Sequence, residues 1–173
     1  VIGAAFNDEN VGAANKVTGT VALKGTEKAK NYTLSSAAFE QAAAIGRADY
    51  NGTASKTVNI VKGRSTVQTG TLTAADFFPE GAVPDGAVIS DVKGGVNSDV
   101  VANMVLNTAT GEFSYTSAVN ITSTTDQTCT VTITSTNYEN ITATLTFHPT
   151  DKETVTISGL TYTGKTYDGK AME

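Results

Sequence analysis

The sequence predicts an all-β fold, and three features support this class. Threonine is the commonest residue type, with 30 of the 173 residues, and its branched Cβ suits a pleated strand better than the turn of a helix. Residues 128–148 alternate apolar and polar side chains on both sides of a polar turn, as a β-hairpin does. Short alternating segments separated by Gly, Asn and Asp occupy most of the remaining chain.

The hairpin predicted at residues 128–148 has two unlike faces. Because successive side chains on a strand point to opposite faces, one face carries apolar residues from both arms and the other carries threonines. We expect Val131 to lie opposite Leu145, and Cys129 to lie near Phe147. An apolar face of this kind must be buried against a second sheet. The residues expected on it are Cys129, Val131, Ile133, Ile141, Ala143, Leu145 and Phe147.

The first 47 residues carry fewer strand signals. Residues 1–12 are expected to form a loop or the end of a strand, and residues 17–23 alternate as a strand that stops at Lys24 and Gly25. Residues 31–34 are expected to begin another strand. Residues 35–45 are ambiguous by propensity, because Ser can cap a helix and Ala propagates one.

Residues 48–149 contain the signals of about seven strands, at the spacing of a sandwich. Residues 73–78 depart from the two-residue period and precede a proline, so we expect a short helical turn capped by Thr73, with Phe77 and Phe78 closing one end of the core. A second hairpin is predicted at residues 99–119, and its expected core residues are Met104, Leu106, Phe113 and Tyr115. The length and strand number are typical of an immunoglobulin-like β-sandwich.

Short motifs recur in order along the chain, as they do in tandem modules. An Asn-Tyr pair occurs at residues 31–32 and again at 137–138, and a Tyr-Asn/Asp-Gly motif occurs at residues 50–52 and again at 167–169. The segments Lys16 to Gly25 and Asn31 to Leu34 resemble the second half of the YDG-type, or MBG-like, repeats of bacterial surface proteins. Lys165-Thr166-Tyr167-Asp168-Gly169 is similar to the signature that opens such a repeat, and the central block resembles the bacterial immunoglobulin-like domains that accompany these repeats.

The resemblance implies a tandem of immunoglobulin-like β-sandwich modules, one complete and two partial. Residues 1–47 would be the C-terminal half of one module, residues 48–152 a complete sandwich, and residues 153–173 the opening strands of the next module. The resemblance also favours a strand over a helix at residues 35–45. Since each partial module leaves an apolar face and an unpaired edge, we expect Thr154 to Glu173 to pair with Val1 to Ile45 of a neighbouring molecule by strand exchange, which gives a homodimer.

The function implied by the resemblance is that of a non-enzymatic spacer in an extracellular bacterial cell-surface or adhesin-like protein. Its partners would be neighbouring repeats of the same protein, and no cofactor is implied. The alternative is an adhesion module that binds a glycan or a host protein through loops at one end of the sandwich. The absence of Trp weakens the glycan version, because sugar rings stack on large aromatic side chains. An enzyme domain is the third alternative.

Charge and composition argue against several other classes. The net charge of −5 and a pI near 4.8, with no cluster of Lys and Arg, disfavour binding to nucleic acid or to anionic membranes. The sequence contains no run of about 18 apolar residues, so it predicts no membrane span. One Cys and one His cannot supply a structural zinc site. We expect Cys129 to be a small buried hydrophobic residue and His148 to be solvated or to cap a strand end.

Two tyrosines are predicted to have structural roles. Tyr32 and Tyr138 each precede the last strand of a module, where a tyrosine can send its hydroxyl back to the backbone as a tyrosine corner. An isopeptide bond from Lys56 to an Asn of the last strand is a further possibility that no feature singles out.

Two places in the sequence carry several side-chain oxygens and are candidate calcium sites. These are residues 7–10, and Asp91 together with Asn97 and Asp99. Neither place has the spacing of an EF-hand, so polar loops are the favoured interpretation.

Overall fold

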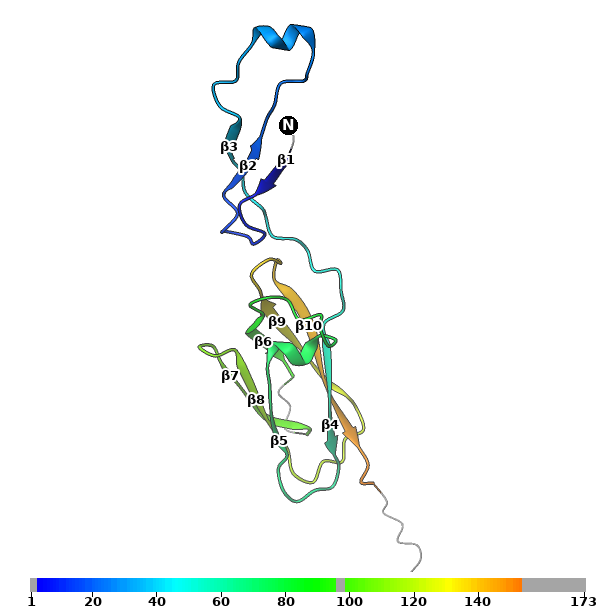
Figure 1. Ribbon diagram of the computed structural model, residues 1–173. Helices are drawn as coiled ribbons and strands as arrows, with labels where there is room; N and C mark the ends of the chain where they lie inside the picture. The colour runs from blue at the N-terminus through cyan, green and yellow to red at the C-terminus, as the bar shows by residue number, and fades with distance from the viewer. Residues whose placement is uncertain (1–2, 96–98, 154–173) are drawn as a thin grey trace, which may run out of the picture.

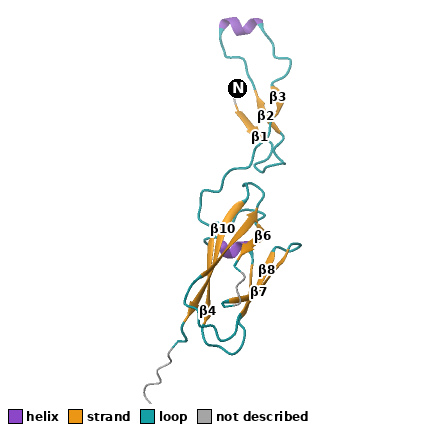
Figure 2. Ribbon diagram, turned by 180° about the vertical axis from the view of Figure 1, so that it is seen from behind, coloured by secondary structure: helices purple, strands orange, loops and turns teal. Residues whose placement is uncertain are grey.

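The computed structural model describes residues 3–95 and 99–153, and it is all-β (Figure 1). The described residues form ten β-strands and two short 3-10 helices, with no α-helix among them. The strands make two units that follow one another along the long axis of the molecule (Figures 1 and 2). We call them the N-terminal sheet (β1–β3, residues 3–42) and the two-sheet unit (β4–β10, residues 55–150). Within the described residues, no helix is long and apolar enough to cross a membrane.

The N-terminal sheet has three antiparallel strands in the order β1-β2-β3. Its third strand lies in the ambiguous segment 35–45, which is therefore a strand, because pairing with β2 outweighs the helix propensity of the alanines. The elements are β1 (Gly3–Phe6), β2 (Lys16–Thr20), the 3-10 helix η1 (Glu27–Asn31) and β3 (Ala38–Ala42).

The prediction that a strand begins at residues 31–34 is wrong, because the chain forms η1 and then a loop there. Thr26 caps the helix by accepting a hydrogen bond from the backbone N–H of Ala29 (3.3 Å). Lys30 Nζ lies 2.6 Å from Glu27 Oε1. These contacts are local in sequence, so they stabilise one helical turn without any tertiary partner.

The two-sheet unit contains seven strands, the number that the sequence predicts for this region. One sheet has the order β4-β10-β9-β6, with β4 parallel to β10 and the other neighbours antiparallel. The other sheet is antiparallel and has the order β5-β8-β7. The two sheets enclose one core, consistent with a β-sandwich. The strands are β4 (Ser55–Val61), β5 (Thr69–Leu72), β6 (Val88–Gly94), β7 (Val101–Asn107), β8 (Glu112–Ser117), β9 (Gln127–Thr134) and β10 (Ile141–Thr150).

The core of the two-sheet unit draws side chains from both sheets. Strict alternation in β9 and β10 buries one face of the hairpin and leaves its threonines toward solvent. In the β7–β8 hairpin, Phe113 is buried as expected, whereas Met104, Leu106 and Tyr115 are only partly buried against the core. The largest fully buried hydrophobic side chains are Phe77, Phe113, Phe147, Ile60, Ile89, Ile133 and Leu145.

The second 3-10 helix, η2 (Ala74–Phe77), forms at the helical turn expected after Thr73. The Asp76 carboxylate accepts hydrogen bonds from the N–H (2.8 Å) and the hydroxyl (3.1 Å) of Thr73, which closes the turn. Phe77 and Phe78 are 1% and 9% exposed. The turn therefore places both phenylalanines in the core, as the sequence predicts.

The register of the β9–β10 hairpin differs from the expected one by two residues. Val131 lies opposite Ala143 rather than Leu145, Leu145 lies opposite Cys129, and Phe147 lies opposite Gln127. A shift of two residues keeps every side chain on its own face, so the apolar pattern does not distinguish the two registers. The length and contacts of the loop between the strands decide between them.

Strand β10 continues through Pro149 to Thr150, three residues beyond Phe147, its last pair with β9. Thr150 accepts a hydrogen bond from the N–H of Lys62 (2.8 Å) on the β4 side. Because neighbouring residues of a strand point their N–H groups to opposite sides, the backbone nitrogen of Pro149 faces the β9 side. No residue of β9 lies there, since β9 begins at Gln127, opposite Phe147. The missing N–H of the proline therefore costs no ladder hydrogen bond.

Candidate functional site

The N-terminal sheet has a mainly apolar face on which no described side chain is buried. Phe6 pairs with Val17, and Ala4 pairs with Gly19, which in turn pairs with Phe39. Since directly paired residues share a face, these side chains lie together on one side of the sheet. We call this side the open face (Ala4, Phe6, Val17, Gly19 and Phe39, with the polar Gln41 paired to Val17 at its edge).

Exposure values show how little the open face is covered. Phe6 is 42% exposed, whereas Val17 and Phe39 are partly buried. Leu23 and Leu34, in the loops around η1 and outside the open face, are also 42% exposed. Among the described residues before Ala54, only Ala14 is buried. Burying one large apolar side chain stabilises a protein by about 1.5–3 kcal/mol. The N-terminal sheet forgoes that stabilisation, and its open face is the candidate interaction site of the chain.

A glycine shapes the open face. A Cβ atom built on Gly19 would lie 2.7 Å from Cε1 and 2.9 Å from Cζ of Phe39, and it would also collide with the carbonyl oxygen of Gly3. The ring of Phe39 therefore lies over Gly19, in space that a side chain at this position would need. A segment that covers the face would meet this ring together with Val17 and Phe6.

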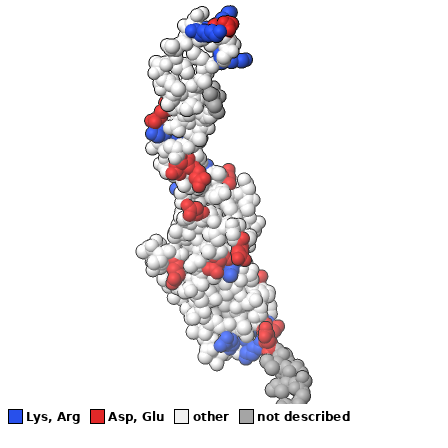
Figure 3. Space-filling model, viewed as in Figure 1, with Lys and Arg blue, Asp and Glu red and all other residues white. Residues whose placement is uncertain are grey.

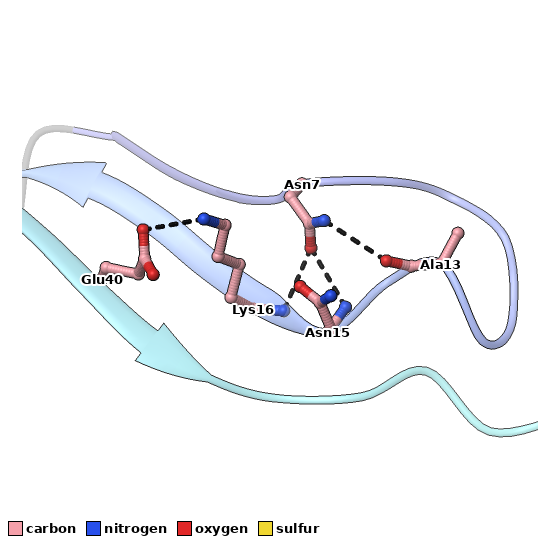
Figure 4. A network of polar contacts seen from close by, with 5 residues as sticks. All are labelled: Asn7, Ala13, Asn15, Lys16 and Glu40. Atoms are coloured by element: carbon pink, nitrogen blue, oxygen red, sulfur yellow. Dashed lines mark hydrogen bonds and ion pairs between the residues drawn. The ribbon is translucent and has the colours of Figure 1, made fainter.

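The loop between β1 and β2 is held by its own asparagines (Figure 4). Asn7 Oδ1 accepts hydrogen bonds from the N–H groups of Asn15 (3.1 Å) and Lys16 (3.0 Å), and Asn7 Nδ2 donates to the carbonyl of Ala13 (3.3 Å). Lys16 Nζ lies 2.9 Å from Glu40 Oε2, on the side of the sheet opposite the open face. The side chain of Asn7 therefore fixes the loop through hydrogen bonds to its backbone.

At the first calcium candidate, residues 7–10, the Oδ1 atoms of Asn7, Asp8 and Asn10 already accept hydrogen bonds from the protein. Asp8 Oδ1 accepts hydrogen bonds from the N–H (2.8 Å) and from Nδ2 (3.1 Å) of Asn10. At the second candidate, Asp91 Oδ2 lies 3.0 Å from Lys93 Nζ, and Asn97 lies outside the described residues. No group of three or more His, Cys, Asp or Glu side chains within the described part of the chain could hold a metal ion.

The hydrophobic residues predicted to stabilise the fold are all in the core. Residues Cys129, Val131, Ile133, Leu145 and Phe147 are between 0% and 4% exposed. Burial raises the pKa of the Cys129 thiol to about 11, which keeps it protonated and unreactive near neutral pH. Burial also raises the pKa of the Tyr115 hydroxyl.

Neither tyrosine forms the expected corner. Tyr32 is 70% exposed and follows η1, so it does not fix a buried strand. Tyr138 is half-buried, and its ring meets that of Tyr50 edge to face, with centroids 5.5 Å apart. No hydrogen bond of the Tyr138 hydroxyl is formed with the described residues, whereas its N–H donates to Ser135 Oγ (3.3 Å). Tyr138 therefore acts through its ring and its backbone.

Two other candidates from the sequence have ordinary polar partners. His148 Nδ1 lies 2.5 Å from Asp126 Oδ1, and both side chains are about half exposed, so the imidazole pairs with a loop carboxylate. Lys56 Nζ lies 3.7 Å from Asp76 Oδ1. The last strand, β10, contains no Asn, so the isopeptide bond considered for Lys56 has no acceptor there.

The loops at the far end of the two-sheet unit enclose an open polar hollow of about 530 Å³. Asn120 has a positive φ of 51°, and its N–H donates to the carbonyl of Arg64 (2.6 Å). Gly63 donates to the carbonyl of Ile121 (3.0 Å), so the β4–β5 and β8–β9 loops are joined. The residues that line the hollow are Asp99, Val119, Asn120, Ile121, Thr122, Ser123, Thr124 and Thr125.

Charged side chains are unevenly spread over the surface (Figure 3). On the face drawn, Asp and Glu gather around the middle of the molecule, where the two units meet, while Lys and Arg are concentrated toward the two ends. An anionic ligand is therefore disfavoured at the middle of this face.

Sequence reasoning missed the structural roles of three polar side chains. Asn7 organises the β1–β2 loop, Asn137 joins the two units, and Gln127 is buried with both amide atoms unpaired among the described residues. The sequence singles out Asn7 only within a calcium candidate and Asn137 only within a repeated motif, because the partners of both asparagines are set by the fold. Gln127 did carry a signal, since it continues the alternation of Cys129, Val131 and Ile133 onto the buried face.

Comparisons with known proteins give little further information. No family model matches the chain, and no curated protein matches it. The chain is similar to the solved structure of the endo-fucoidan hydrolase MfFcnA4 from glycoside hydrolase family 107, with 13% identity and a TM-score of 0.34 over 67% of this chain and 17% of that chain. A variant of the same enzyme gives 14% identity and a TM-score of 0.35 over the same shares. The chain thus spans only 17% of the length of these enzyme chains, and no activity follows from the likeness.

Proposed function

We propose that this chain is a non-enzymatic spacer module of an extracellular bacterial surface or adhesin-like protein. One observation carries the proposal: the N-terminal sheet and the two-sheet unit lie end to end, so each unit adds to the length of the molecule (Figures 1 and 2). The exposed threonines of β9 and β10 supply a polar exterior. The single Cys is buried, which leaves no exposed thiol among the described residues.

The proposal includes an immunoglobulin-like arrangement of the two-sheet unit. Its sheets have the orders β4-β10-β9-β6 and β5-β8-β7, with the first strand parallel to the last. In immunoglobulin-like sandwiches the third, sixth and seventh strands share a sheet, and the second, fourth and fifth share the other. The same grouping occurs here, with the first strand added beside the seventh. This grouping supports the tandem of immunoglobulin-like modules that the resemblance to surface-protein repeats implies.

The proposed partners are neighbouring repeats of the same protein and a second copy of the chain. The open face offers a partly uncovered, mainly apolar surface, and β1 is an edge strand of its sheet. The segment Thr154 to Glu173 lies outside the described residues, and its sequence alternates at Thr154-Val155-Thr156-Ile157 as a covering strand would. Strand exchange between copies would place this segment on the N-terminal sheet of a neighbour.

The exchange is tested by light scattering over a range of concentrations. We expect dimers or larger assemblies from the native chain and monomers from Ile157→Asp, because a charge on the covering face opposes burial. Thr156→Asp is the matched control and should associate normally. A native chain that stays monomeric at high concentration, with both ends protected from proteolysis, contradicts the exchange.

Two measurements test the spacer role. Small-angle X-ray scattering should give an elongated particle whose length matches the two units placed end to end. An array of glycans and host matrix proteins should give no specific signal. A compact particle refutes the end-to-end arrangement, and a specific signal on the array refutes the purely structural role.

The polar hollow at the loop end supports a second candidate, an adhesion module for a glycan or a host protein. Its lining is rich in hydroxyl groups, which can exchange hydrogen bonds with sugar hydroxyls. A loop-dependent signal on the array, lost in Ser123→Ala and Thr124→Ala but kept in Thr144→Ala on the exposed face of β10, would support this function. An array signal that survives the loop substitutions would exclude the hollow as its source.

A further inference from the structure

The segment that joins β3 to β4 is fastened to the two-sheet unit at its middle. Ala48 donates its N–H to the carbonyl of Asn137 (3.0 Å) and accepts a hydrogen bond from the N–H of Glu139 (2.9 Å), which makes a short bridge to the β9–β10 loop. The ring of Tyr50 then meets Phe78 (5.4 Å) and Tyr138 (5.5 Å) edge to face. The joining segment is therefore part of the two-sheet unit from Ala48 onward.

The side chain of Asn137 reaches in the other direction, to the N-terminal sheet. Its Nδ2 donates to Asn10 Oδ1 (2.9 Å), and its Oδ1 accepts a hydrogen bond from the N–H of Val11 (2.9 Å). Asn10 is itself held by Asp8, whose carboxylate accepts from the N–H and the Nδ2 of Asn10. One residue thus binds the joining segment through its backbone and the β1–β2 loop through its side chain.

The rest of the contact between the units is thin. The residues around Asn137 leave an open hollow of about 210 Å³, lined by Glu9, Val11, Ile45, Gly46, Ala48, Asn137 and Tyr138. The stretch before Ala48 contains Gly46, which has no side chain to restrict its backbone. Without other restraints, a short segment of this kind allows the two units to rotate relative to one another.

We infer that Asn137 is the residue that fixes the orientation of the N-terminal sheet relative to the two-sheet unit. A carboxamide has one donor group and one acceptor atom, and both are used on the same loop, so any rotation about the joining segment breaks two hydrogen bonds at once. The inference concerns the conformation of the chain and holds whether or not the chain is a spacer.

The test measures the distance between the two units with paired spin labels. Labels on Thr33→Cys and Thr108→Cys place one probe in each unit, since both positions are exposed, and native Cys129 is buried. We expect a narrow distance distribution in the native background. Asn137→Ala should broaden it, with roughly a tenfold or greater rise in the population of other orientations, as for the loss of two ordinary hydrogen bonds.

Two further variants separate this role from a general loss of stability. Asn10→Ala removes one acceptor on the N-terminal sheet without altering the two-sheet unit, and it should broaden the distribution less than Asn137→Ala does, because the bond from the N–H of Val11 remains. Asn140→Ala changes an exposed residue of the same β9–β10 loop and should leave the distribution narrow. The unfolding transition of the two-sheet unit should be the same in Asn10→Ala and the native chain. A broad distribution in the native background, or a narrow one in both Asn10→Ala and Asn137→Ala, overturns the inference.

Discussion

Replacing Gln127 with methionine should stabilise the two-sheet unit. Gln127 is 9% exposed and faces the core from the start of β9, opposite Phe147. Both Oε1 and Nε2 are buried and have no hydrogen-bond partner within the described residues. A buried polar group without a partner carries a desolvation penalty that no contact offsets. Gln127→Met removes this group and keeps a long, unbranched side chain.

The expected gain follows from two opposing effects. Leaving a buried donor or acceptor unpaired costs about 1–3 kcal/mol. A volume-conserving change in a core costs up to about 1.5 kcal/mol through imperfect packing. The net increase in the free energy of unfolding should therefore be about 1 kcal/mol, which corresponds to roughly 4–8 °C in the melting temperature of a unit of about 100 residues.

Urea unfolding followed by tyrosine near-ultraviolet circular dichroism provides the assay, because the chain has no Trp. The midpoint should rise in Gln127→Met while the slope m stays unchanged. Thr128→Met is the matched control: its side chain is on the exposed face of the same strand, so the change should stay within about 0.5 kcal/mol. A loss of more than about 1.5 kcal/mol in Gln127→Met would refute the reasoning, since it would mean that the amide has a partner.

Further tests address Leu145, Cys129 and Tyr138. Leu145→Ala removes a side chain that is 0% exposed and should cost about 2–5 kcal/mol in urea unfolding, whereas Thr144→Ala on the exposed face should cost far less. Cys129 should resist iodoacetamide in the native state and react once the chain is unfolded. Burial raises the pKa of the Cys129 thiol in the folded state to about 11. The protonated thiol therefore contributes to the free energy of unfolding fully below its pKa in the unfolded chain, and this contribution is lost as the pH rises toward 11. Tyr138→Phe should leave stability unchanged, because the hydroxyl has no described partner, while Tyr138→Ala should lower it by removing the ring contact with Tyr50. A decrease of about 1 kcal/mol in the free energy of unfolding of Tyr138→Phe would instead support the hydroxyl hydrogen bond of a tyrosine corner.

Alternation along the chain was enough to predict the all-β class and the faces of the strands. It placed Cys129, Val131 and Ile133 in the core because side chains on a strand repeat every two residues. The same periodicity explains why the partner of Val131 was predicted wrongly. Moving the pairing by two residues leaves the buried set unchanged, so only the loop between β9 and β10 fixes the register.

The N-terminal sheet was harder to predict because local and tertiary effects oppose each other there. The alanines of β3 favour a helix, yet pairing with β2 makes them a strand. The apolar residues Tyr32 and Leu34 suggested a strand, yet Thr26 and the pair of Glu27 with Lys30 produce η1 just before them. Where a segment has few tertiary contacts, its caps and local ion pairs decide its structure.

The two Asn-Tyr pairs show why the candidate sites could not be read from the sequence. Asn31-Tyr32 and Asn137-Tyr138 have the same residues and both precede the last strand of their unit. Tyr32 is 70% exposed, whereas Tyr138 packs on Tyr50 and Asn137 bonds to a loop more than 100 residues earlier in the chain. The difference arises because Asn137 faces the N-terminal sheet and Tyr138 packs on Tyr50 within its own unit, whereas the side chains of Asn31 and Tyr32 have no such partner among the described residues. A dipeptide of this kind acquires a role only from the residues that lie against it, so a segment placed against Tyr32 should find the same amide and ring available there.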